Sequence, residues 1–230
     1  MTEEGENFAS ALKHALRKGF AGALMLLGFT GAAVLLHTTL SAETSVDAGS
    51  GLVRFFSYFT IQSTLAVTGW SAFQTFRKPP ASQADQGPRE RKDSAVQLAL
   101  LASSILTAVG YYALLDATWK PQGLSAFGNL LVHAVVPTLF VLDWLVFERK
   151  GRLRLRSVAV TLVLPAFHIA AALLVGIRSG EYPYYFLDPT LLGTAVFLRN
   201  ALCFAVLFVL TGMLLCLVDR LMERRPVKSR

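Results

Sequence analysis

The stretch that decides the fold is Leu191–Val218, LLGTAVFLRNALCFAVLFVLTGMLLCLV, in which Arg199 is the only charged residue. A helix needs about 20 mostly apolar residues to cross a hydrocarbon core about 30 Å thick. Five more segments meet this requirement, at about 19–38, 52–74, 95–115, 126–147 and 156–177. We therefore predict an all-α polytopic membrane protein, with residues 1–230 forming a single domain of six transmembrane helices.

The composition agrees with a membrane protein, because 53% of the residues are hydrophobic and only 16% are charged. The formal net charge is +7. Its distribution predicts lipid contact rather than nucleic-acid binding, since the basic residues gather in short clusters beside the apolar segments, where anionic lipid would attract them. We expect the lipid bilayer and a lipid-like substrate as partners, and no nucleic acid.

The basic clusters also predict the orientation of the chain. They lie in the N-terminal tail, after the second segment, after the fourth segment and in the C-terminal tail, whereas the alternate loops hold only Lys120 and Arg178. Because Lys and Arg accumulate on the cytoplasmic side, both termini are expected there. In this arrangement residues 79–93 form a polar cytoplasmic linker.

Four polar side chains in different segments are predicted at one depth in the membrane. Thr60, His133, His168 and Arg199 each lie eight or nine residues in from the outer end of their segment. At 1.5 Å per residue this corresponds to about 12–14 Å below the outer boundary. Ionisable residues inside a membrane are costly and point to a functional site.

A structural role is the alternative for several of these positions. Ser57, Thr64 and Ser71 share one helical face with Thr60, and hydroxyl stripes of this kind usually serve helix packing, which is the expected role of Ser57, Thr64 and Ser71. His168 fits a structural histidine bonded to a neighbouring helix equally well. Arg199 fits either a side chain that extends toward the outer interface or one that pairs with an acidic group.

Three short motifs resemble a known family in order and spacing: Arg54–Ser63 (RFFSYFTIQS), Asn129–His133 (NLLVH) with Pro137 downstream, and Tyr182–Asp188 (YPYYFLD). They are similar to the motifs of bacterial six-span relatives of the androgen-induced/FAR-17a membrane proteins. Animal members hydrolyse fatty-acid esters of hydroxy fatty acids within the membrane, using a threonine nucleophile and a histidine base.

The resemblance assigns the nucleophile to Thr60 and the base to His133, and implies a location in the bacterial cytoplasmic membrane. No metal or other cofactor is expected. Thr64 stands where asparagine is expected in bacterial relatives, so the substrate is a weaker inference than the catalytic pair. The remaining candidate binding or supporting residues are Arg54, Ser63, Asn129, His168, Asp188 and Arg199.

Threonine is a weak nucleophile unless a neighbouring base takes its proton, and histidine suits that role. In many hydrolases a carboxylate orients the histidine. Asp116 and Asp188 are the candidates for this role, and a simple dyad is the alternative. Arg199, Asn129 or the backbone could stabilise the oxyanion.

Two other functions fit the same polar residues. In a membrane haem protein, His133 and His168 would be axial ligands. In a lipid-binding protein or transporter without catalysis, the polar layer would be the ligand site. The sequence leaves the oligomeric state open.

Overall fold

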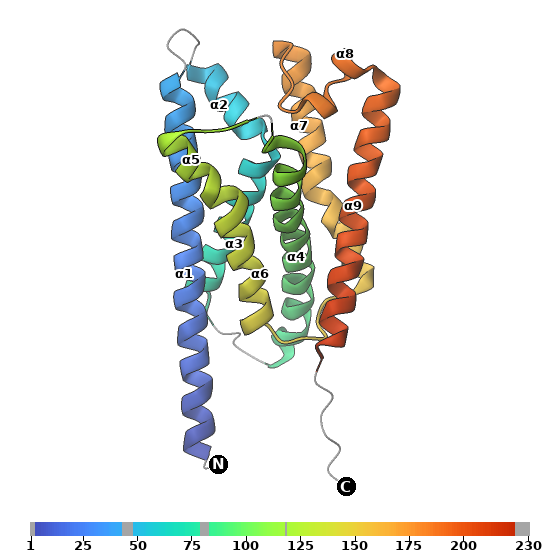
Figure 1. Ribbon diagram of the computed structural model, residues 1–230. Helices are drawn as coiled ribbons and strands as arrows, with labels where there is room; N and C mark the ends of the chain where they lie inside the picture. Colours follow the sequence, from blue (N-terminus) through green and yellow to red (C-terminus); the bar gives the residue numbers. More distant parts are fainter. Residues whose placement is uncertain (1–2, 43–47, 79–82, 118, 224–230) are drawn as a thin grey trace. The chain divides into compact units, whose positions relative to one another are not determined.

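The computed structural model describes residues 3–42, 48–78, 83–117 and 119–223, and every regular element in these ranges is a helix (Figure 1). Five helical stretches among them are long and apolar enough to cross a membrane. The prediction of an all-α fold is therefore confirmed for the described residues, and the five long apolar stretches agree with an integral membrane protein. The five stretches are Ala11–Ser41, Glu90–Leu115, Gly123–Phe147, Leu155–Ser179 and Thr194–Leu221.

Several of these stretches consist of consecutive elements of different helical type. The elements are, in order, α1 (Glu3–Ala42), α2 (Ala48–Ser57), α3 (Phe59–Phe76), α4 (Gln83–Gly110), the π-helical turn η1 (Tyr111–Leu115), α5 (Gly123–Leu130), the π-helical turn η2 (Leu131–Val135), α6 (Val136–Phe147), the 3₁₀ helix η3 (Leu155–Leu162), α7 (Val163–Ser179), the 3₁₀ turn η4 (Tyr185–Leu187), α8 (Pro189–Leu192) and α9 (Thr194–Leu221).

The chain forms two compact units, each described here by itself. The first contains residues 1–79 and 107–148, and the second contains residues 80–106 and 149–230. The helix α4 contributes to both, because its last residues, from Thr107 onward, belong to the first unit.

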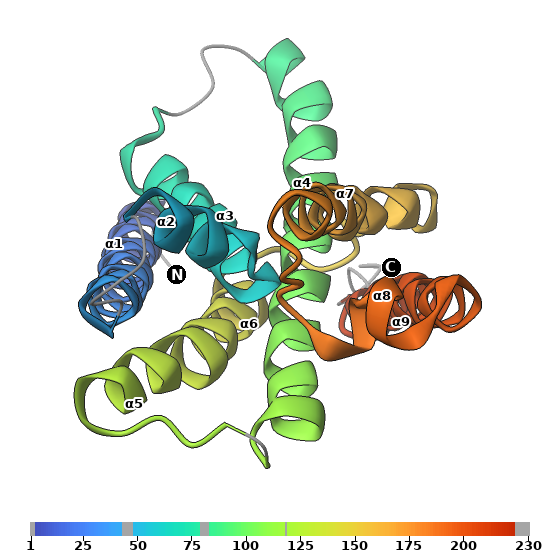
Figure 2. The ribbon, with the colours of Figure 1, turned by 90° about the horizontal axis from the view of Figure 1, so that it is seen from above.

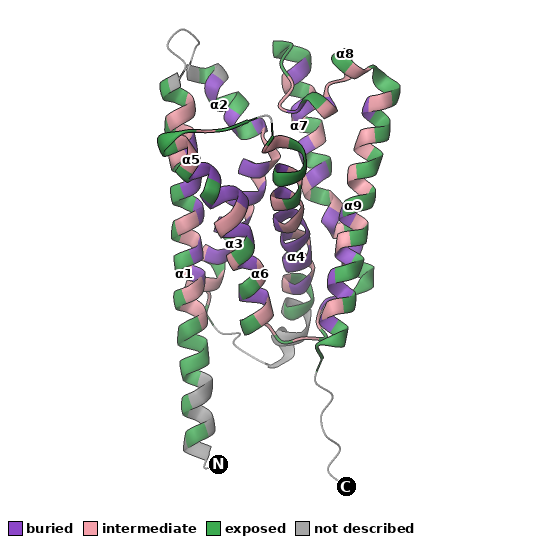
Figure 3. Ribbon diagram, in the orientation of Figure 1, coloured by how far each residue is buried: buried purple, intermediate pink, exposed green. Residues whose placement is uncertain are grey.

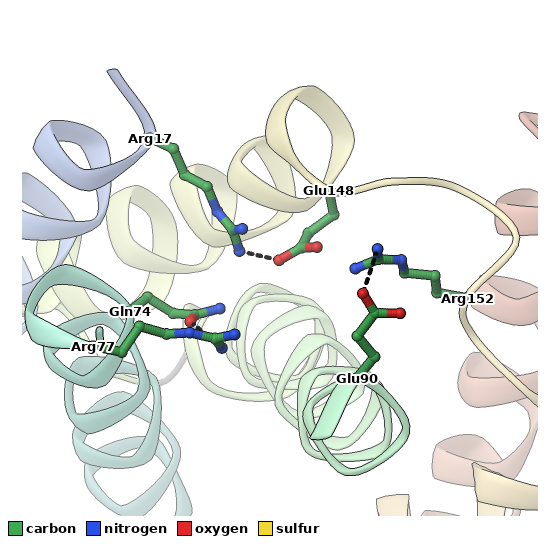
Figure 4. Close-up of polar contacts among 6 residues, drawn as sticks. All are labelled: Arg17, Gln74, Arg77, Glu90, Glu148 and Arg152. Atoms are coloured by element: carbon green, nitrogen blue, oxygen red, sulfur yellow. Dashed lines mark hydrogen bonds and ion pairs between the residues drawn. The ribbon is translucent and has the colours of Figure 1, made fainter. Parts of the chain in front are cut away.

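In the first unit, α1 lies beside α3 and α5 (Figures 1 and 2). Glycines of α1 allow a close approach: a Cβ on Gly28 would overlap the hydroxyl of Thr68, and a Cβ on Gly31 would lie 2.9 Å from Val132 Cγ1. Small residues serve membrane helices in this way, because backbones that approach closely gain van der Waals contact. An ion pair between Arg17 and Glu148 joins α1 to the end of α6 (Figure 4).

The predicted second transmembrane segment, 52–74, is not one continuous helix. It is divided at Tyr58, whose φ of −75° and ψ of 130° are extended, so that α2 ends and α3 begins there. Side chains donate hydrogen bonds to backbone carbonyls beside the break. Gln62 Nε2 donates to Phe56 O at 2.9 Å, and Ser57 Oγ donates to Arg54 O at 2.7 Å. Local bonds of this kind compete with the regular helical ladder. α3 is also rich in hydroxyls, and it is not among the five apolar stretches.

Two other predicted boundaries differ from the structure. The linker predicted at 79–93 is helical from Gln83 onward, because the Gln, Ala, Glu, Arg and Lys residues here favour a helix. Residues 79–82 of that linker, and the basic tail from 224 onward, lie outside the described residues. The last apolar segment, predicted to begin at 191, begins as a continuous helix at Thr194, because Gly193 has a φ of +77° that interrupts the chain between α8 and α9.

In the second unit, α9 packs against η3, where Thr161 is fully buried. Apolar side chains on the outside of α9 are exposed, among them Leu198, Leu202 and Leu210, as is usual for a helix that faces lipid (Figure 3). Arg152 forms an ion pair of 3.1 Å with Glu90 (Figure 4).

Near its end, α9 carries a fully buried carboxylate, Asp219, which accepts a hydrogen bond of 2.8 Å from the backbone N–H of Leu153. Asp219→Ala is expected to lower the free energy of unfolding by about 1–3 kcal/mol, because it leaves this N–H buried without its acceptor. Asp219→Asn is the matched control, since its amide oxygen can still accept. Thermal unfolding in detergent compares the two, and an alanine variant as stable as the wild type would contradict the assignment.

Candidate functional site

The first unit brings together the two residues assigned as nucleophile and base. Thr60 Oγ1 lies 3.1 Å from His133 Nε2, and both side chains are buried, with 9% and 5% of their surface exposed. The two residues are far apart in the sequence and belong to different helices. The distance is that of a direct hydrogen bond.

The second ring nitrogen of His133 determines the direction of that bond. His133 Nδ1 lies 3.2 Å from the backbone carbonyl oxygen of Asn129. A carbonyl can only accept, so Nδ1 carries the proton, and in the neutral ring Nε2 is the acceptor. The hydroxyl of Thr60 therefore donates to Nε2, which is the arrangement that a general base requires.

Local irregularities of the backbone position both residues. Thr60 stands in the first turn of α3, directly after the break at Tyr58. His133 lies in the π-helical turn η2, where Val136 N–H donates to Leu131 O, five residues earlier. Pro137 has no N–H for the carbonyl of His133, four residues before it, so the regular α pattern cannot continue here. π-helical turns in α-helices occur frequently at functional sites.

Tyr111 also belongs to the cluster and was not identified from the sequence. The ring of Tyr111 stacks on the imidazole of His133, with 3.9 Å between ring centroids and 26° between the planes. Asn129 Nδ2 donates to the Tyr111 hydroxyl at 2.7 Å. Tyr111 begins the other π-helical turn, η1. Its position near the outer end of an apolar segment is typical of an interfacial tyrosine, so the sequence carries no signal that separates it from Tyr112.

A chain of hydroxyls supports the turn that holds Thr60. Ser63 Oγ donates to Thr60 O at 3.0 Å and lies 2.9 Å from Thr107 Oγ1. Since the Ser63 proton is used on the carbonyl, Thr107 is the donor in the second bond. The predicted residue Ser63 therefore supports the backbone of Thr60 and links it to the end of α4.

Thr107→Val is expected to lower the free energy of unfolding by about 1 kcal/mol, because one buried hydrogen bond is lost while the side-chain shape is kept. Thr107→Ser keeps the hydroxyl and serves as the control. The measurement is thermal unfolding in detergent. A valine variant with the stability of the wild type would contradict a stabilising hydrogen bond between Thr107 and Ser63.

The other predicted residue of the first unit, Arg54, lies on the exposed side of α2. Asp116, a candidate for orienting the histidine, pairs with Lys120 at 2.9 Å instead. The group that holds His133 Nδ1 is the backbone carbonyl of Asn129.

The remaining predicted residues belong to the second unit. His168 is buried and lies edge-on to the ring of Tyr184, with centroids 5.6 Å apart. Arg199 is exposed on α9, and its guanidinium donates to Asn200 Oδ1 at 3.2 Å.

Asp188, also in the second unit, caps the short helix α8. The Thr190 hydroxyl and the backbone N–H groups of Leu191 and Thr190 donate to its carboxylate, and these bonds hold the pKa of Asp188 below its usual range. Its contacts are those of an N-cap residue.

The described ranges hold no group of three His, Cys, Asp or Glu side chains that could bind a metal ion. Comparison of the chain with protein-family models, with curated proteins and with solved structures gave no match. The function is therefore argued from the geometry of the cluster formed by Thr60, Tyr111, Asn129 and His133.

Proposed function

We propose that this protein is an intramembrane hydrolase of lipid esters, with Thr60 as the nucleophile and His133 as the general base. The observation that carries the proposal is the buried hydrogen bond of 3.1 Å between Thr60 Oγ1 and His133 Nε2. The protonated Nδ1, held by the Asn129 carbonyl, leaves Nε2 free to take the proton of the threonine.

The reaction proceeds in two halves. Thr60 Oγ1 attacks the ester carbonyl carbon while its proton moves to His133 Nε2. The tetrahedral intermediate collapses, the ester C–O bond breaks, and Nε2 returns the proton to the leaving alkoxide, which departs as an alcohol. A water molecule then attacks the acyl-threonine, gives its proton to Nε2, and the fatty acid leaves as the proton returns to Thr60.

The proposed catalytic group is a dyad supported by the backbone. In a triad a carboxylate orients the histidine and stabilises the imidazolium. Here the Asn129 carbonyl orients the ring, and Asp116 and Asp188 have other partners. For the oxyanion, the candidates in the same unit are the Asn129 side chain and the backbone N–H groups at the start of α3.

A long-chain acyl ester is the proposed class of substrate, because the nucleophile is buried among apolar helices that offer acyl chains an environment like lipid. Fatty-acid esters of hydroxy fatty acids are the specific candidates, by the resemblance of the RFFSYFTIQS and NLLVH motifs to the androgen-induced/FAR-17a family. The chain would then be a bacterial relative of that family, located in the cytoplasmic membrane.

We propose six spans with both termini on the cytoplasmic side. α3 would be the remaining span, because its 18 residues correspond to about 27 Å. Its buried hydroxyls, at Thr60, Ser63, Thr64, Thr68 and Ser71, lower its hydropathy without exposing it to lipid. The alternation of basic clusters supports this topology.

Labelling with a long-chain fluorophosphonate tests the proposal, because the probe reacts with activated hydroxyl nucleophiles whatever the natural substrate. The wild-type protein in detergent micelles should be labelled, and mass spectrometry should locate the adduct on Thr60. Thr64→Ala, one turn further along α3, is the matched control and should be labelled too. An unlabelled wild type, or an adduct on another residue, would refute the assignment.

The same measurement separates the hydrolase from its two alternatives. A ligand-binding protein or transporter without catalysis would not be labelled. As a haem ligand, His133 would have to give up one of its two present hydrogen bonds, to Thr60 or to Asn129. The purified wild type is therefore expected to show no Soret band.

A further inference from the structure

Tyr111 has more contact with the proposed base than packing alone would require. The residue is 3% exposed, and its ring stacks on the imidazole of His133 with 26° between the planes and a centroid separation of 3.9 Å. The two residues come from separate helices, and each stands in a π-helical turn. The wider turns set both rings at positions that a regular α-helix would not give them.

The same tyrosine also reaches the residue that holds the other side of the imidazole. Its hydroxyl accepts from Asn129 Nδ2 at 2.7 Å, and the backbone carbonyl of Asn129 accepts from His133 Nδ1 at 3.2 Å. Tyr111, Asn129 and His133 thus form a closed ring of contacts. The stack fixes the plane of the imidazole, and the carbonyl fixes its rotation and tautomer.

The charge that develops during catalysis gives this arrangement a chemical role. When His133 takes the proton of Thr60, a buried imidazolium forms, and a buried charge is costly unless it is stabilised. The negative face of an aromatic ring attracts a cation placed over it, most strongly where water is excluded. The ring of Tyr111 occupies that place.

We propose that Tyr111 is a positioning residue of the reaction, which holds the imidazole of His133 by its ring face and stabilises the imidazolium as the proton is transferred. This inference rests on the proposed hydrolase function. Since Tyr111 acts through His133, its removal should slow the chemical step and leave the binding of the acyl chain unchanged.

The first test compares Tyr111→Phe with Tyr111→Leu in fluorophosphonate labelling, with the maximal rate constant (kinact) and the half-saturating probe concentration measured separately. Tyr111→Phe keeps the ring face and is expected to retain kinact within about threefold, whereas Tyr111→Leu should lose about tenfold or more. The half-saturating concentration should not change in either. A folded leucine variant with wild-type kinact, or a phenylalanine variant as slow as leucine, would overturn the proposal.

The second test keeps the shape of the side chain and therefore the fold. Phenylalanine with one, two or three fluorine atoms is incorporated at position 111, which weakens the negative ring face stepwise. The logarithm of kinact should fall with each fluorine, as it would not for a side chain that only fills space. An unchanged kinact across the series would overturn the proposal. A wild type that is not labelled at Thr60 would instead refute the hydrolase itself, so the two failures are distinguishable.

Discussion

Thr60→Ala is expected to reduce ester hydrolysis by roughly 10³-fold or more, because it removes the atom that forms the acyl intermediate. His133→Ala should have an effect of similar size, since Thr60 Oγ1 then has no base within hydrogen-bond distance of its proton among the contacts described above. The measurement is the release of p-nitrophenol from a long-chain p-nitrophenyl ester, with the protein in detergent micelles or nanodiscs.

A double substitution sharpens this prediction. Residues that act as one catalytic unit are strongly non-additive, so Thr60→Ala/His133→Ala should be about as slow as either single variant. Thr60→Ser is the conservative control and should retain measurable activity, because it keeps a hydroxyl at the same position. A Thr60→Ala variant with more than about a tenth of the wild-type rate would exclude the residue as nucleophile.

Gly31→Leu is expected to have the second-largest effect, on both stability and activity. A Cβ at this position would lie 2.9 Å from Val132 Cγ1 and 3.0 Å from Leu131 Cβ, which belong to the turn that carries His133. Such overpacking costs about 1–3 kcal/mol or more, and relieving it must move η2 away from α1. We expect a lower apparent Tm and at least a tenfold slower labelling of Thr60, since small displacements of reacting groups are costly.

Gly19→Leu is the matched control for this substitution. It lies on the same helix, and a Cβ placed on Gly19 meets no atom within 4 Å beyond the adjacent residues and the nearby backbone of its own helix. Replacing glycine by leucine in a helix is in itself favourable, so this variant should be at least as stable as the wild type. If both variants behaved alike, close packing of α1 against η2 would not control the site.

The long apolar stretches could be predicted from the sequence because a spanning helix is recognised by its length and its apolar composition alone. The second segment could not be described fully, because its break at Tyr58 has no proline or glycine to mark it. The side chains of Gln62 and Ser57 replace the lost backbone hydrogen bonds. Whether they can contact those carbonyls depends on the folded geometry. The start of the last apolar helix is set by Gly193, whose positive φ interrupts the chain. A count of apolar residues does not detect such a backbone conformation.

For the site, equal depth placed four residues in one layer, and the resemblance of the motifs selected Thr60 and His133 among them. Depth says nothing about which helices are neighbours, and His168 and Arg199 share the depth while belonging to the other unit. Tyr111 and the carbonyl of Asn129 escaped prediction for different reasons. The tyrosine looks interfacial, and a backbone oxygen is present at every residue, so only the fold can select one.

The hydroxyl-rich face of α3 has a consequence for biosynthesis. In the proposed topology, a segment with five buried hydroxyl residues gains little by entering lipid alone. Its hydroxyls are shielded only after it has docked. The helix α1 precedes α3 in the chain and so leaves the ribosome earlier, and it supplies a surface on which Gly28 leaves room for Thr68. The two helices should therefore leave the insertion machinery as a pair, so that a substitution in α1 can cause failure of membrane integration before any tertiary structure exists.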